Sequence, residues 1–180
     1  MSKLAPGLVL GLDLSPKVGW ALGRPGDAPR WGMRELPKED GLGACCATFE
    51  DWLDEFLENE RPDLISYEAP LAPDLQGSRE TCEYNYGLPF AARGCAFRAQ
   101  IEIVSHSIDT LRGAVIGRTR LTEDEKRVRP RLTVKKAIIE PWVRSMGWSI
   151  GDDNARDAAV VWGYEVGMRH EMFGRKRRPA

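Results

Sequence analysis

Apolar residues alternate with other residues at the start of the chain. In the run LVLGLDLSPKVGWALG, Leu8 to Gly23, a leucine falls at every second position up to the Ser-Pro pair, so these leucines share one face of a predicted strand and Asp13 falls on the other face. Ser-Pro predicts a turn, and Val18 to Gly23 is the predicted hairpin partner. A buried carboxylate must be neutralised, hydrogen-bonded or matched by a cation, so the fold must compensate Asp13.

The rest of the chain alternates strand-like and helical patterns. Apolar residues recur at spacings of three and four from Leu42 to Glu60, which predicts an amphipathic helix. Strands are also predicted at Arg30 to Leu36, Asp63 to Tyr67 and Ile101 to Ser105, and helices at Ser78 to Ala99 with an interruption near Gly87-Leu88-Pro89, Thr133 to Met146 and Asn154 to Met168. This order predicts one α/β domain over residues 1–180, with a mixed sheet and helices on its faces.

The composition is that of an ordinary globular protein. The chain has 180 residues, of which 42% are hydrophobic and 29% are charged, and no apolar run approaches the length of a membrane span. Its first residues do not form a secretion signal. We therefore expect a cytoplasmic protein without a membrane partner. The cysteines lack zinc-type spacing, so we expect them to be reduced core residues: Cys45, Cys46, Cys82 and Cys95.

Charge is distributed unevenly along the chain. From Glu35 to Glu83 there are 14 acidic and 3 basic residues, whereas from Arg112 to Arg144 there are 10 basic and 4 acidic residues. The basic half is the candidate for binding a polyanion, although such a stretch taken alone is more often a solvated face. Within it, Arg118 to Arg131 is too polar for a core and is expected to be a mobile, charged loop. A basic tail, residues 174–180, either adds to the basic surface or is disordered.

Further acids follow another predicted strand and open the last predicted helix. Glu68 comes directly after the strand DLISY, and the helix begins in the segment GDDNARDAAVVWGY. On a helix, Asp153 and Asp157 share a face, and so do Asn154 and Asp157, whereas Asp152 points away from Asp157. Converging carboxylates repel one another unless a divalent cation lies among them. Oxygen ligands without His or Cys favour Mg²⁺ or Mn²⁺.

Simpler explanations exist for the separate pieces. Asp152, Asp153 and Asn154 are residue types that cap a helix N-terminus, and Glu68 before Ala-Pro is compatible with a solvated loop. Asp13, within an apolar run, is harder to explain in this way. The three features together favour a metal site.

The order and spacing of these motifs resemble a known family. The motifs are GLDLSPKVGWAL around Asp13, ISYEAP around Glu68 and DDNARDAA around Asp157, with SIDTLRG and LTVKKAII between them. They resemble the RuvC family of Holliday-junction resolvases, particularly its phage-type members, within the ribonuclease H-like superfamily. The resemblance implies an α/β ribonuclease H-like fold, a five-stranded mixed sheet in the order 3-2-1-4-5 flanked by helices.

The resemblance also implies an activity. Such a protein is a Mg²⁺-dependent endodeoxyribonuclease that resolves four-way (Holliday) DNA junctions by two-metal-ion hydrolysis, with paired nicks, with Mn²⁺ as a substitute and without a nucleotide cofactor. Asp13, Glu68 and Asp157 match three of the four acidic positions of the family. Members commonly have Asp or His three residues before the last Asp, where this chain has Asn154. Asp153 is the charged alternative, so we predict Asp153 as the fourth ligand and Asn154 as the second choice.

Binding positions follow from the same resemblance. Arg112, Lys135 and Lys136 match basic positions that contact DNA. Leu71 stands on the loop three residues after the Glu, where the family has an aromatic residue that helps to open the junction. Because a four-way junction has two-fold symmetry, the resemblance implies a homodimer, and the predicted helix from Ser78 to Ala99 is the candidate interface.

Three alternatives stay open. Sugar kinases and actin-like ATPases also open with a Gly-x-Asp strand, but they need a second, duplicated domain for which 180 residues leave no room. A related ribonuclease H-like nuclease could act on other branched or on single-stranded DNA. The third alternative is a catalytically inactive DNA-binding member of the fold, which Asn154 keeps open.

Overall fold

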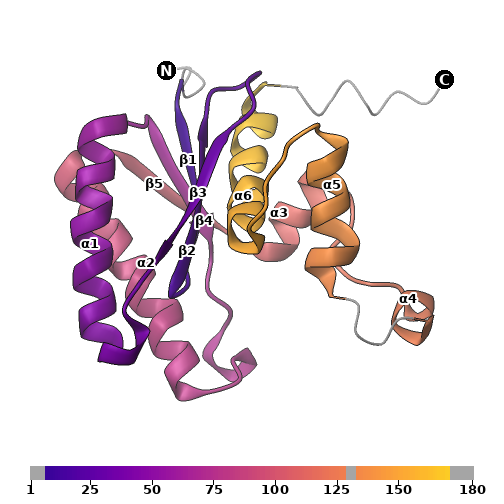
Figure 1. Ribbon diagram of the computed structural model, residues 1–180, viewed down its shortest axis with the longest axis horizontal. Coiled ribbons are helices and arrows are strands. Elements are labelled where there is room, and N and C mark those ends of the chain that lie inside the picture. Colours follow the sequence, from indigo (N-terminus) through magenta and orange to yellow (C-terminus); the bar gives the residue numbers. More distant parts are fainter. Residues whose placement is uncertain (1–6, 129–132, 171–180) are drawn as a thin grey trace.

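The computed structural model describes residues 7–128 and 133–170. Five strands form one sheet in the order β3-β2-β1-β4-β5, which confirms the predicted order (Figure 1). β1 pairs antiparallel with β2, which pairs antiparallel with β3, whereas β1, β4 and β5 run parallel. The strands are β1 (Val9–Asp13), β2 (Lys17–Gly23), β3 (Arg30–Glu35), β4 (Leu64–Glu68) and β5 (Glu102–His106).

Helices cover both faces of this sheet (Figure 1). On one face, α1 (Gly41–Glu60) and α2 (Arg79–Ala99) pack on a core that includes Leu10 and Leu12. On the other face, α6 (Asp153–His170), α3 (Ile108–Val115) and α5 (Glu140–Ser145) pack on a core that includes Val9. The alternation of side chains along β1 therefore separates two hydrophobic layers.

The helix α2 is continuous, and the interruption predicted near Pro89 is wrong. Ser78 caps the helix, because its side-chain oxygen accepts a hydrogen bond from the Thr81 backbone N–H. Pro89 removes one backbone donor from the helix interior, but Leu88 and Pro89 are both buried: Leu88 lies in the core shared with α1, and Pro89 lines the cavity beside Asp13 and Glu68. Burial of this face outweighs the local preference of proline to end a helix.

The region after β5 is more helical than predicted. Helix α3 begins directly after Ser107, and the expected loop from Arg118 to Arg131 contains the short helix α4 (Glu123–Val128). The predicted helix Thr133 to Met146 is observed as a π-helical turn, Lys135–Ile139, that continues into α5. Residues 129–131 of that expected loop and the basic tail, residues 174–180, lie outside the described residues.

The remaining features of the fold are two short 3-10 helices and the cysteines. The 3-10 helices are Lys38–Asp40 before α1 and Pro73–Leu75 in the loop after β4. All four cysteines are free thiols; two are buried in the core as predicted and two are partly buried at its edge. In the described part of the chain, no helix is long and apolar enough to cross a membrane.

Candidate active site

Two carboxylates lie side by side at the carboxyl edge of the parallel strands. Asp13 is the last residue of β1, and Glu68 is the last residue of β4. These strands are parallel neighbours with Leu12 opposite Tyr67, so the next residue of each strand falls at the same level. Leu12 and Tyr67 face α1 and α2. Because side chains alternate, Asp13 and Glu68 point to the face that α6 covers.

The helix α6 brings Asp157 to these two acids. A Cβ atom added to Gly19 would lie only 2.1 Å from the Asn154 carbonyl oxygen of α6, and one added to Gly11 would also meet the backbone of α6. Gly19 is the ladder partner of Asp13. The two glycines therefore allow the helix backbone to touch β1 and β2, and this contact places Asp157 near Asp13.

The three carboxylates share an environment that opposes their negative charge. Burial, followed by the charge of Asp157, raises the pKa of Asp13 to about 8. Burial also raises the pKa of Glu68 to about 7, against the opposing effect of Arg112. Burial likewise raises the pKa of Asp157 above its usual range. Any positive charge added near the site therefore stabilises the ionised form of these carboxylates.

Two protein cations supply part of that charge. The Lys135 Nζ lies 2.6 Å from one carboxylate oxygen of Asp157, and a guanidinium nitrogen of Arg112 lies 3.7 Å from the other. Burial acts against the charge of Lys135, but Asp157 outweighs it and raises the pKa of the lysine. Both cations also oppose the rise in the pKa of Asp13. They therefore offset part of the cost of burying this carboxylate in the first strand.

The start of α6 separates the candidates for a fourth ligand. Asp152 is the helix cap, because its carboxylate accepts hydrogen bonds from the Asn154 and Ala155 backbone N–H groups at 2.9 Å. Asp153 is half exposed and pairs with Arg156 at 2.8 Å. The Asn154 side-chain oxygen instead accepts a hydrogen bond from the Lys135 Nζ at 3.2 Å. The structure thus links Asn154 to Asp157 through the lysine and turns the Asp153 carboxylate toward Arg156.

A cavity of about 170 Å³ opens beside Asp13 and Glu68 and is also lined by Leu71. The Leu71 side chain is exposed, while its carbonyl oxygen accepts hydrogen bonds from Gln76 Nε2 at 2.7 Å and from the Tyr86 hydroxyl at 3.0 Å. The loop after β4 is therefore tied to α2 and presents an apolar side chain next to the carboxylates.

The two neighbouring lysines differ in their surroundings. Lys135 reaches the carboxylates, whereas Lys136 is exposed on the same turn of helix. In the interactions between described residues, the Lys136 ammonium contacts no carboxylate. The pattern LTVKK could not distinguish them, because only the packing of this turn against α6 decides which lysine points inward.

His106 is a neighbour of the site that the sequence did not indicate. It is the last residue of β5 and lies in register with Glu68. Its Nε2 is 2.5 Å from a carboxylate oxygen of Glu165 on α6, and its ring packs against Tyr164. A single histidine in a strand carries no spacing signal. The pair ties the edge strand β5 to the helix that carries Asp157.

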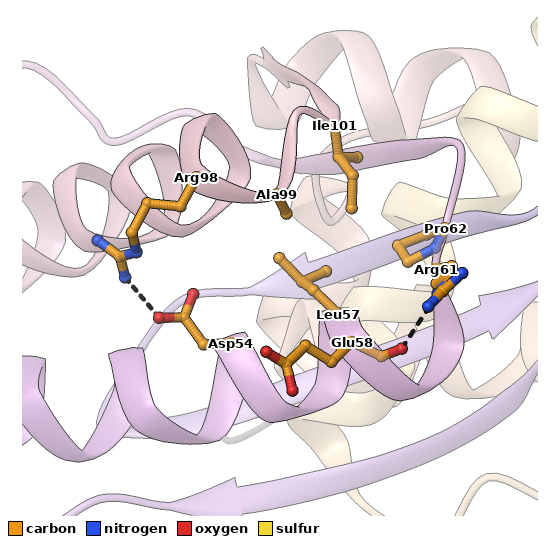
Figure 2. A pocket seen from close by; sticks show the side chains of 8 residues that line it. All are labelled: Asp54, Leu57, Glu58, Arg61, Pro62, Arg98, Ala99 and Ile101. Carbon is orange, nitrogen blue, oxygen red and sulfur yellow. Dashed lines mark hydrogen bonds and ion pairs between the residues drawn. The ribbon is translucent and has the colours of Figure 1, made fainter.

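A larger groove of about 530 Å³ lies away from this site, between the ends of α1 and α2 (Figure 2). Its acidic and basic side chains are largely satisfied: Arg98 pairs with Asp54 at 2.7 Å, and Arg61 donates to the Glu58 carbonyl oxygen. It borders the residues that precede β4 and β5, at the opposite end of these strands from Glu68. The groove brings together no set of groups suited to catalysis.

Comparisons with known proteins support the fold. No family model and no curated protein matches the sequence. The structure of RuvC from Thermus thermophilus matches with a TM-score of 0.66 at 13% identity, over 93% of this chain and 96% of that chain. RuvC of T. thermophilus in complex with a Holliday junction substrate matches with a TM-score of 0.67, again at 13% identity and over the same shares of both chains.

A third solved structure belongs to another organism. The yeast mitochondrial Holliday junction resolvase matches with a TM-score of 0.56 at 15% identity, over 96% of this chain and 85% of that chain. The chain therefore has a ribonuclease H-like α/β fold. More particularly, its fold is that of RuvC, as the order of its motifs predicted.

Proposed function

We propose that this protein is a structure-selective endonuclease that resolves four-way DNA junctions by metal-dependent phosphodiester hydrolysis, with paired nicks. The observation that carries the proposal is the meeting of Asp13, Glu68 and Asp157 at one edge of a RuvC fold. Two of the solved structures with this fold support the substrate: one holds a Holliday junction, and the other is named a Holliday junction resolvase.

The donor atoms of the site fit a divalent metal ion. They are carboxylate oxygens with an amide oxygen nearby, which suits Mg²⁺ or Mn²⁺. Burial raises the pKa values of Asp13 and Glu68, and Lys135 and Arg112 oppose this rise only in part, so a bound cation would favour the ionised carboxylates. Among the described residues, no three acidic, His or Cys side chains are already arranged around one metal position. We therefore expect small side-chain rotations when an ion binds.

Asp13, Glu68 and Asp157 would hold two ions, with Asp153 or Asn154 as the further ligand. Bound Mg²⁺ or Mn²⁺ would supply the activation of a water molecule and the stabilisation of the entering and leaving oxygens. Burial raises the pKa of Asp157, and the Lys135 ammonium opposes that rise. With Asp157 held as a metal ligand, the Lys135 ammonium would be available to bind a phosphate oxygen of the DNA.

The remaining DNA contacts surround this edge of the sheet. Arg112 and Lys136 would bind phosphates, which fixes the position of the DNA and reads no sequence. Leu71, exposed beside Glu68, would lie against bases near the branch point. The acidic helix α1 packs on the opposite face of the sheet, away from these residues (Figure 1).

A homodimer would form through α2. Phe90 and Phe97 are exposed by 81% and 84%, and they are seven residues apart, so they lie on the same side of this helix. Large apolar side chains this exposed are typical of interaction surfaces. Two active sites related by this contact would match the two-fold symmetry of a four-way junction.

The test of the function is cleavage of a synthetic four-way junction in Mg²⁺ or Mn²⁺, with linear duplex and flap controls. We expect paired nicks in the junction and little cleavage of the linear duplex. Preferred cleavage of the flap or of single strands would support a related nuclease with another substrate. Junction binding without cleavage in either ion would show an inactive member of the fold.

The exposed lysine gives a prediction about binding. We expect Lys136→Ala to reduce the slope of log affinity against log salt concentration by about 0.9, because one phosphate contact and its counterion release are lost. Junction affinity measured at several salt concentrations checks this. Lys135→Ala is the matched comparison, and we expect it to lower the cleavage rate at saturating junction. If Lys136→Ala leaves the salt slope unchanged, Lys136 belongs to a solvated helix face.

The fourth ligand gives a second prediction. The sequence ranked Asp153 first because of its charge, but the observed contacts favour Asn154, whose side-chain oxygen faces the lysine that bridges to Asp157. We expect Asn154→Ala to lower cleavage by about tenfold, with partial rescue at high Mn²⁺ because mass action refills a weakened site. Asn154→Asp should lower the Mg²⁺ concentration needed for half-maximal cleavage. Cleavage against metal concentration checks both variants.

Asp153→Ala is the control for this comparison. It removes, from the same turn of α6, a carboxylate that pairs with Arg156 and whose charge also acts on Lys135 and Asp157. A larger loss of activity for Asp153→Ala than for Asn154→Ala would make Asp153 the ligand.

A further inference from the structure

Arg118 connects the segment after α3 to the turn of helix that carries Lys135. The Arg118 guanidinium makes two hydrogen bonds to the Glu125 carboxylate, at 3.0 and 3.1 Å. The same guanidinium donates to the Ala137 carbonyl oxygen at 3.3 Å. One side chain therefore connects α4, which lies apart from the sheet in Figure 1, to the π-helical turn.

Glu125 is itself held in place by the start of α4. Its backbone N–H donates to the Thr122 hydroxyl oxygen at 3.2 Å, and its carboxylate accepts a hydrogen bond from the Thr122 backbone N–H at 2.8 Å. This reciprocal arrangement is a capping box, which fixes the first turn of a helix. The pair with Arg118 is the main cause that lowers the pKa of Glu125. Arg118 therefore binds a carboxylate that cannot easily move away.

The other end of the connection is an unusual turn. Residues Lys135–Ile139 form a π helix, in which the backbone hydrogen bonds span one residue more than in an α helix. Such turns occur mostly as single turns and often at functional sites, because they shift the direction of the side chains around them. Ala137, which accepts the hydrogen bond from Arg118, lies in the middle of this turn. Lys135, which reaches Asp157, begins it.

We propose that Arg118 is a positioning residue: through Glu125 and the Ala137 carbonyl, it holds the π-helical turn in the geometry that places the Lys135 ammonium at Asp157. The inference rests on the proposed nuclease function. It assigns a role to the polar segment from Arg118 to Arg131, which has no equivalent among the motifs that predicted the active site. Neither Arg118 nor Glu125 lies among the residues that surround the carboxylates.

The test compares Arg118→Ala with Arg127→Ala. Arg127 lies in the same segment, and among the described residues its guanidinium pairs with Asp124 on the surface of α4, so this variant measures the effect of losing one positive charge there. We expect Arg118→Ala to lower the rate of junction cleavage at saturation about tenfold below that of Arg127→Ala. Junction affinity should be the same for both variants within about twofold, because the charge lost is equal.

Coupling to Lys135 distinguishes positioning from general stability. If Arg118 acts through Lys135, Arg118→Ala combined with Lys135→Ala should cleave no more slowly than Lys135→Ala alone. Arg118→Lys keeps one donor for the Ala137 carbonyl and should restore part of the rate. Equal cleavage by Arg118→Ala and Arg127→Ala, or additive losses in the double variant, would overturn the proposal.

A measurement without DNA separates this proposal from the proposed function. Amide hydrogen exchange over residues 135–139 should be faster in Arg118→Ala than in Arg127→Ala, because the turn loses its external hydrogen bond. Absence of junction cleavage by the unmodified protein would refute the nuclease function and leave this comparison valid. Equal exchange in the two variants would refute the positioning role.

Discussion

Asp13→Asn is expected to reduce junction cleavage at least about a thousandfold, equivalent to about 4 kcal/mol of transition-state stabilisation, and to leave junction binding intact. The reason is a division of roles. In the proposed mechanism, the chemistry needs the carboxylate of the central strand β1 for metal binding, whereas junction binding needs the phosphate contacts of Arg112 and Lys136. An amide has nearly the same shape as the carboxylate, but it has no charge to hold a divalent cation.

The same substitution should stabilise the protein in the absence of divalent ions. Burial raises the pKa of Asp13 to about 8, so the folded state holds this proton more tightly than the unfolded state, in which the value is near 3.8. Stability is therefore lost as the pH rises from about 4 to about 8, and little more is lost above that range. Asp13→Asn removes this loss. At pH 9 with a chelator, we expect its Tm to exceed that of the unmodified protein by at least roughly 2–4 °C.

Three measurements check the prediction: cleavage rate, junction affinity and Tm from pH 5 to pH 9, with and without Mg²⁺. Mg²⁺ should raise the Tm of the unmodified protein at pH 8, and this increase should be much smaller for Asp13→Asn. Asp27→Asn, in an exposed turn, is the matched control. Loss of junction binding in a folded Asp13→Asn protein would contradict the division of roles. A Tm difference that does not grow with pH would contradict the assigned burial cost.

Replacing Phe90 and Phe97 together by Glu is expected to convert a dimer into a monomer. The chain has a mass of 20.2 kDa, so the dimer should have twice this mass in sedimentation experiments. Exposed aromatic residues at the centre of an interface commonly contribute about 2 kcal/mol or more each, so the double variant should weaken dimerisation at least about a hundredfold. The monomer should then nick a four-way junction on one strand without the paired second nick.

Leu75→Glu is the control for this experiment, because Leu75 is also an exposed apolar residue, at 67%, but lies outside α2. It should leave the sedimentation behaviour unchanged. A dimer that persists with Glu at both positions of α2 would place the interface elsewhere. A protein that is monomeric before any substitution would refute the homodimer.

Local sequence patterns were sufficient for much of the candidate site. Asp13 and Glu68 each end a strand that its apolar residues make recognisable, and parallel neighbours bring such ends together. Helix spacing placed both Asp153 and Asn154 on a face with Asp157, so it did not decide between them as the fourth ligand. These predictions depend on strand and helix periodicity, which the nearest residues in the chain already determine.

Other features depended on contacts between distant segments. The pattern LTVKK did not show that Lys135 points toward Asp157 while Lys136 faces solvent, because this depends on how the π-helical turn packs against α6. Nothing local indicated that Gly19 must lack a side chain, since the atom that a Cβ would meet belongs to Asn154, far along the sequence. Pro89 was misleading for the same reason: its local preference is to end a helix, but the burial of this part of α2 keeps the helix continuous.

By itself, the sequence determined the strands and the longer helices, but not α3 and α4, together with the carboxylates at the strand ends and the resemblance to RuvC, because these follow from periodicity and motif spacing. Only the tertiary structure decided which groups from separate elements meet: Lys135 with Asp157, and Arg118 with Glu125 and the Ala137 carbonyl. The physical reason is that an ion pair depends on a separation of a few ångströms in space. Close packing of whole elements sets that separation, through contacts that residue spacing does not encode.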